Sequence, residues 1–64
     1  MIVVLPTNLQ EKIAQKPETG MGYHIVTIVT TEGQEIPGAV ILNGSIVKLP
    51  KNIKIISNQI SDII

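Results

Sequence analysis

The two side chains best suited to chemistry stand together in the stretch Glu18-Thr19-Gly20-Met21-Gly22-Tyr23-His24. It contains the only aromatic residue and the only histidine of the chain. An imidazole exchanges protons near neutral pH, and a tyrosine offers a stacking face and one hydroxyl. At a subunit interface such a loop would suit a small polar, nucleotide-like ligand. The predicted ligand-binding residues are Gly20, Met21, Gly22, Tyr23 and His24.

The same stretch also has a purely structural interpretation, which we favour. Glycine accepts positive φ, and both Gly20 and Gly22 precede the stretch from Tyr23, which is rich in β-branched residues. A phosphate-binding loop follows a strand and opens a helix, whereas these glycines come before a strand. The loop is therefore expected to start a β-hairpin.

The residues needed for catalysis are missing. His24 has no second histidine and no cysteine as a partner, and no nucleophile, base and acid are spaced as in a known triad. Glu32 and Glu35 flank a predicted turn and are expected to be solvated. We therefore predict a protein that is not an enzyme, with no catalytic residue, no metal site and no cofactor.

The size of the chain points to self-association. A single domain of 64 residues buries only about 60% of the surface that its unfolded form exposes, so its stability is marginal. The chain has no cysteine, which excludes disulfides and thiolate metal sites. A homo-oligomer is the remaining route to stability.

Charge and hydropathy disfavour two further partners. The formal net charge is zero and arginine is absent, which removes the side chain that most often contacts phosphates and guanine edges. Lys48, Lys51 and Lys54 are read as a solvated rim, so nucleic acid is not the expected partner. The apolar start ends at Pro6 after five residues, which indicates neither a signal peptide nor a membrane span. We expect a cytoplasmic protein without membrane contact.

The spacing of apolar residues predicts one short helix and several strands. The segment from Ile2 to Leu5 reads as a short buried strand, and the next eleven residues as an amphipathic helix capped by Thr7 or Asn8. Turns at Glu32-Gly33 and Asn43-Gly44 predict two hairpins, with a bulge or edge bend at Pro37-Gly38. The expected fold is mainly β: a small SH3-like or Sm-like barrel, or a curled antiparallel sheet, with one short N-terminal helix.

The strand from Tyr23 to Thr30 has two faces, and both are largely apolar. One face carries Tyr23, Ile25, Thr27 and Val29, and the other carries His24, Val26, Ile28 and Thr30. Two dry faces favour a barrel that also makes a subunit contact. The tail from Asn58 to Ile64 fits a helix or a strand, and its isoleucines are expected to dock onto the barrel or a neighbour. The predicted interface residues are Val26, Ile28, Ile60, Ile63 and Ile64.

The segments "IVVLPTNL" from Ile2 and "IVKLPKNI" from Ile46 share Ile, Val, Leu, Pro and Asn. Two such copies, each a strand followed by a Pro-x-Asn turn, are compatible with a duplication. An alphabet rich in Ile and Val also makes chance matches easy.

Two resemblances add to these expectations. The stretch from Pro17 to Tyr23, "PETGMGY", with the Glu32-Gly33 turn and the late Ser61-Asp62-Ile63-Ile64, resembles a group of small bacterial proteins of unknown function. That likeness implies a small β-rich domain and no activity. "VVLPTNLQEKI" followed by "NGSIVKLP" is similar to swapped-hairpin transition regulators and antitoxin DNA-binding domains. Those domains use arginines and a first strand that this chain lacks.

The leading functional hypothesis is a non-enzymatic interaction module. It would self-associate and bind a partner protein through an apolar strand edge or the C-terminal tail. The alternative is a protein that binds or sequesters a small molecule at the Gly20–His24 loop. A swapped-hairpin DNA-binding regulator is the third possibility.

Overall fold

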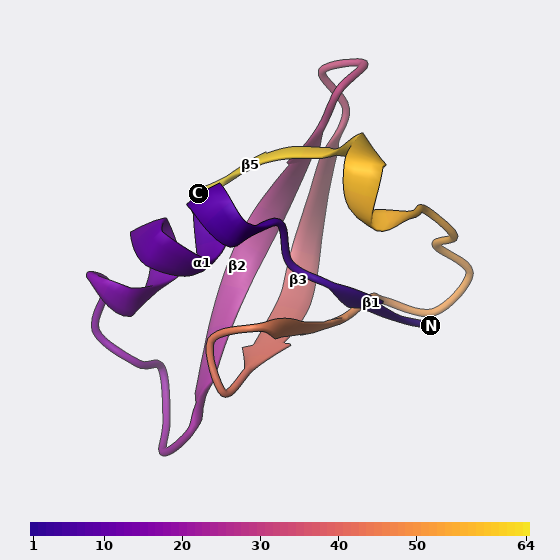
Figure 1. The fold of residues 1–64 in the computed structure, drawn as a ribbon. Helices are drawn as coiled ribbons and strands as arrows, with labels where there is room; N and C mark the ends of the chain where they lie inside the picture. The colour runs from indigo at the N-terminus through magenta and orange to yellow at the C-terminus, as the bar shows by residue number, and fades with distance from the viewer.

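The computed structural model describes residues 1–64, and its five antiparallel strands form one sheet that curls into a half-barrel (Figure 1). The strands occur in the spatial order β1-β4-β3-β2-β5. The predicted mainly β fold with one short N-terminal helix is confirmed, in its curled-sheet form. The elements in chain order are β1 (Ile2–Val4), α1 (Thr7–Ala14), β2 (Tyr23–Thr30), β3 (Glu35–Leu42), β4 (Ile46–Lys48), the 3₁₀ turn η1 (Ser57–Gln59) and β5 (Ile60–Ile63).

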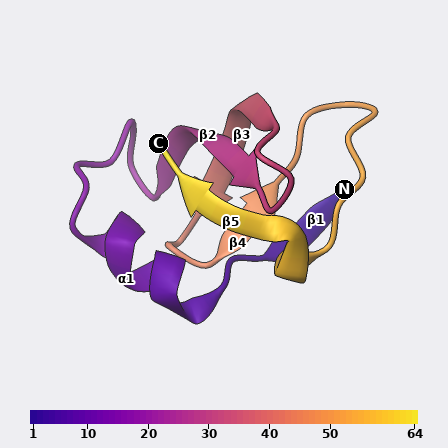
Figure 2. The same ribbon diagram turned by 90° about the horizontal axis from the view of Figure 1, so that it is seen from above.

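The core lies between the helix and the concave side of the sheet. Seen from above, α1 and the strands β2 and β3 lie on opposite sides of the molecule (Figure 2). Leu9 and Ile13, one helical turn apart on α1, pack in one cluster with apolar side chains of every strand but β1. The twelve buried residues of this cluster are Leu5, Leu9, Ile13, Val26, Ile28, Ile36, Ala39, Ile41, Val47, Leu49, Ile60 and Ile63. No helix of the fold has the length and apolar character needed to cross a membrane.

The start of α1 differs from the prediction. The residue at the N-cap position is Pro6, and no side chain caps the helix, so Thr7 and Asn8 do not have the expected role. A capping box needs a backbone N–H at the N-cap, which proline lacks. The Gln10 side chain instead donates to the Leu5 carbonyl at 2.8 Å.

Strand β1 is not buried as expected. Ile2 and Val4 are exposed, while Val3, between them, packs against the core. A strand at the margin of a sheet with one covered face shows this alternation. The apolar side chains at Ile2 and Val4 therefore belong to the surface.

The central hairpin has the predicted turn and bulge. Gly33 has a φ of +84° in the turn, and Gly38 a φ of +80°. The pairing shifts between Val26–Ala39 and Ile28–Ile36, which leaves one extra residue in β3. Strand β3 is central rather than an edge strand, but β4 ends opposite Val40, so the bulge has no ladder neighbour on that side.

The second hairpin also has its predicted turn conformation, with an extra residue. Asn43 and Gly44 have φ values of +53° and +73°. Leu42 pairs with Ile46, so the connection contains three residues and not two. The extra residue, Ser45, accepts a hydrogen bond from the Leu5 N–H through its carbonyl at 2.8 Å.

The internal sequence echo has a structural counterpart. Its two copies supply β1 and β4, which pair antiparallel with Val3 opposite Val47. The Leu5 N–H donates to the Ser45 carbonyl and the Leu49 N–H to the Met1 carbonyl, which are equivalent positions of the two copies. The two strands are thus related by a local two-fold axis, whereas the last residues of the first copy begin a helix and those of the second form a turn.

Candidate functional site

The Gly20–His24 loop is held by its own backbone. The N–H groups of Thr19 and Gly20 donate to the Tyr23 carbonyl at 3.0 and 3.3 Å, and the Tyr23 N–H donates back to Gly20. Gly22 has a φ of +83°, a backbone conformation that residues with a Cβ rarely adopt. The Tyr23 ring covers Gly20 so closely that a Cβ there would overlap it. These contacts make the loop the start of β2, as the structural interpretation predicted.

His24, the last residue of this loop, is buried on the core side of β2. Its Nε2 lies 3.0 Å from the Lys16 carbonyl, and because a carbonyl only accepts, Nε2 carries the proton and donates. Nδ1 is buried and has no hydrogen-bond partner. The histidine thus ties the end of the helix segment to β2.

The structure brings Gly20 and Tyr23 together, whereas the His24 side chain lies on the opposite, core face of β2, and no pocket forms there. Met21 projects from the tip of the loop and is almost fully exposed. Ligand binding by these residues remains a prediction, to which the geometry adds no cavity.

The predicted interface residues are mostly in the core. Val26, Ile28, Ile60 and Ile63 are buried within the single chain, and only Ile64 is exposed. A partner contact through these four side chains would require the fold to open. The tail is strand β5, which pairs with β2, so it serves the fold itself.

The opposite, outer side of the sheet carries the exposed apolar surface. Alternate residues of neighbouring strands align there in two rows. One row runs from Ile2 through Lys48 and Val40 to Ile25, and the other from Val4 through Ile46 and Leu42 to Tyr23. We call these eight residues the outer face: Ile2, Val4, Tyr23, Ile25, Val40, Leu42, Ile46 and Lys48.

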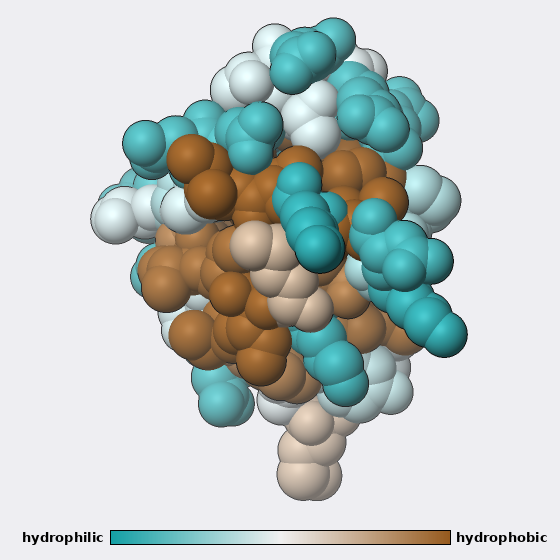
Figure 3. All heavy atoms as spheres, turned by 90° about the vertical axis from the view of Figure 1, so that its right-hand side faces the viewer, coloured by the Kyte–Doolittle hydropathy of each residue, from teal (hydrophilic) through white to brown (hydrophobic).

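The outer face is apolar and accessible. The exposed fractions are 64% for Ile2, 56% for Val4 and 53% for Ile25. Figure 3 views the side of the molecule that carries the N-terminus, where apolar side chains gather into a broad area crossed by a few hydrophilic ones. Lys48 is the single charged residue of the outer face. Contiguous apolar surface rimmed by polar groups is typical of a protein interaction site.

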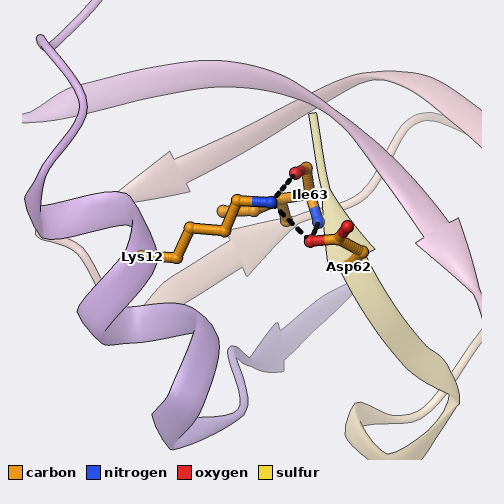
Figure 4. Close-up of polar contacts among 3 residues, drawn as sticks. All are labelled: Lys12, Asp62 and Ile63. Atoms are coloured by element: carbon orange, nitrogen blue, oxygen red, sulfur yellow. Dashed lines mark hydrogen bonds and ion pairs between the residues drawn. The ribbon is translucent and has the colours of Figure 1, made fainter.

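A separate ion pair connects α1 to β5, and Figure 4 shows its three residues. The Lys12 ammonium lies 2.7 Å from Asp62 Oδ1 and donates to the Ile63 carbonyl at 2.9 Å. The Lys12 hydrogen bond, supported by one from the Ile63 N–H, lowers the pKa of Asp62 below its usual 3.8. Lys12 thereby places a charged side chain on a backbone carbonyl at the free edge of β5. Charged side chains at a sheet edge commonly prevent pairing with a further strand.

Acidification should release the contact between Lys12 and Asp62. Because the pKa of Asp62 is lower in the folded state, its contribution to stability is complete above pH 3.8 and disappears as the pH falls through the folded-state pKa. Asp62→Asn removes the charge. The thermal midpoints of the wild type and this variant should therefore differ near neutral pH and converge in acid. A difference that stays constant down to about pH 2 would contradict this assignment.

The comparisons with known proteins add no relative. No family model matches the chain, and neither the curated proteins nor the solved structures contain a match. The fold and the outer face are therefore the basis for the functional inference.

Sequence reasoning missed the outer face and the Lys12–Asp62 pair. The signal for the outer face was present, since both faces of β2 were recognised as apolar. What was missing was the strand order, which places β4 beside β3 and β1 beside β4. Lys12 and Asp62 lie 50 residues apart, and no local pattern joins them.

Proposed function

We propose that this protein is a non-catalytic interaction module that binds another protein through the outer face of its sheet. The observation that carries the proposal is the pair of apolar rows across β1, β4, β3 and β2. Burying exposed apolar side chains is the main favourable term in most protein associations. The outer face offers such side chains on a rigid hydrogen-bonded scaffold.

The two edges of the sheet indicate which segments take part in the proposed binding. The edge at β5 is occupied by Lys12. The edge at β1 has no charged residue, and its exposed Ile2 and Val4 continue the outer face. The Val4 carbonyl accepts a hydrogen bond from Ser57 Oγ at 2.5 Å, so part of the β1 backbone is already used. Strand β1 therefore contributes mainly its side chains. The C-terminal tail, whose Ile60 and Ile63 are buried in the core, is not part of the proposed binding surface.

A site-specific photo-crosslinker tests this function. A benzophenone side chain at position 25 lies on the outer face, and the same side chain at exposed Ala14 on α1 is the matched control. We expect a covalent protein adduct from position 25 in the host cell and none from position 14. Equal yields at the two positions, or no adduct at position 25, would contradict the proposal.

A further inference from the structure

We propose that the protein which covers the outer face is a second copy of this chain, in a two-fold symmetric dimer of sheets packed face to face. This inference rests on the proposed function and names its partner. In such a dimer the same patch is used on both copies, so the patch must be complementary to itself.

The exposed area of the outer face approaches what a dimer needs. With ordinary side-chain areas, its eight residues expose on the order of 600 Å². Two copies would together bury about 1,200 Å², the lower limit of a stable interface. The molecule measures 28 × 23 × 16 Å, so a second sheet of the same dimensions covers the patch fully. Met1, which is exposed beside Ile2, adds apolar area at the margin.

The arrangement of side chains is self-complementary. An axis that runs along the strands between β3 and β4 places β1 of one copy over β2 of the other. Ile2 then faces Ile25 of the second copy, and Ile46 faces Leu42. Packed sheets lie about 10 Å apart with strands about 30° from parallel, which allows apolar side chains of this length to interdigitate.

The charges permit this association. The chain has a formal net charge of zero, so two copies do not repel each other as whole molecules. Lys48 is the last residue of β4, which puts it at the end of its strand. Its aliphatic stem can cover apolar surface while the ammonium reaches water at the rim. A surface that binds an acidic partner would be expected to carry several cationic side chains, whereas the outer face carries one, Lys48.

Sedimentation equilibrium of the untagged full chain tests the dimer. The wild type should show twice the mass of one chain at micromolar to millimolar concentrations. Ile25→Lys places a charge opposite Ile2 of the second copy, twice per dimer, and should raise the dimer Kd at least about tenfold. Leu42→Lys, also on the outer face, should do the same, whereas Ala14→Lys on α1 should leave the Kd unchanged. Circular dichroism of each variant verifies that the exposed substitution has left the fold intact.

Three results would overturn the inference in distinguishable ways. If the wild type sediments as a single chain while position 25 still forms adducts with a different protein, the second copy is wrong and the proposed function stands. If position 25 forms no adduct at all, both fail. If Ile25→Lys and Leu42→Lys dimerise as tightly as the wild type, the dimer uses another surface.

Discussion

Replacing Ile28 by alanine should remove about 2–5 kcal/mol from the free energy of unfolding. Ile28 is fully buried at the centre of the sheet, where its strand is paired with β3 on one side and β5 on the other. A chain of this length has roughly 3–10 kcal/mol in total, so the variant should be partly unfolded at 25 °C. Urea unfolding followed by circular dichroism measures the change.

Val29→Ala is the matched control, because Val29 is the next residue of the same strand and only half-buried on the other face. We expect a loss of no more than about 1 kcal/mol from that variant. Equal losses from the two substitutions would mean that the core does not lie on the Ile28 side of β2.

Introducing aspartate at Ile63 should abolish folding, whereas the same change at the next residue should be tolerated. Ile63 is fully buried in β5, and Ile64 is 62% exposed. A carboxylate at position 63 would lose its hydration without gaining a partner, which costs several kcal/mol, more than a chain of this size can lose. The amide dispersion of one-dimensional proton NMR spectra distinguishes a folded from an unfolded variant.

The outcome decides the role of the C-terminal tail. A folded Ile63→Asp variant would show that β5 is dispensable and free to act as a binding segment. An unfolded Ile64→Asp variant would show that burial extends to the last residue. The pair uses one residue type at adjacent positions, so the two variants differ in burial and not in chemistry.

The hairpins could be predicted from the sequence because their signals are local. Glu32-Gly33, Asn43-Gly44 and Pro37-Gly38 each require or favour a specific backbone conformation, and the structure shows positive φ at Gly33, Gly38, Asn43 and Gly44. The helix was predictable from the spacing of Leu9 and Ile13, although its cap was not.

The outer face could not be predicted, since it depends on which side of the sheet the rest of the chain covers. The alternation along β2 correctly grouped His24, Val26 and Ile28 on one face and Tyr23 and Ile25 on the other. Both faces are apolar, so the alternation does not show which face of β2 packs into the core and which is exposed. Burial by α1 and β5 is what makes the first face the core and leaves the second as surface.

The segment Ile53–Ile56 shows the same limit. Its burial alternates as in a strand, with Ile53 and Ile55 packed against the core. The N–H groups of Lys54 and Ile55 donate to no other group of the chain, so the segment forms no ladder. Apolar patterning gives the direction of side chains, whereas a strand also needs a backbone partner.

The most direct test of the central claim is an isotope-filtered nuclear Overhauser experiment on an equimolar mixture of ¹³C-labelled and unlabelled chain. It detects only contacts between different copies. The dimer predicts cross-chain signals from the methyl groups of Ile2, Val4, Ile25 and Leu42. Cross-chain signals from the methyl groups of α1 alone, or none from the outer face in a sample that sediments as a dimer, would contradict the claim that a second copy covers the outer face.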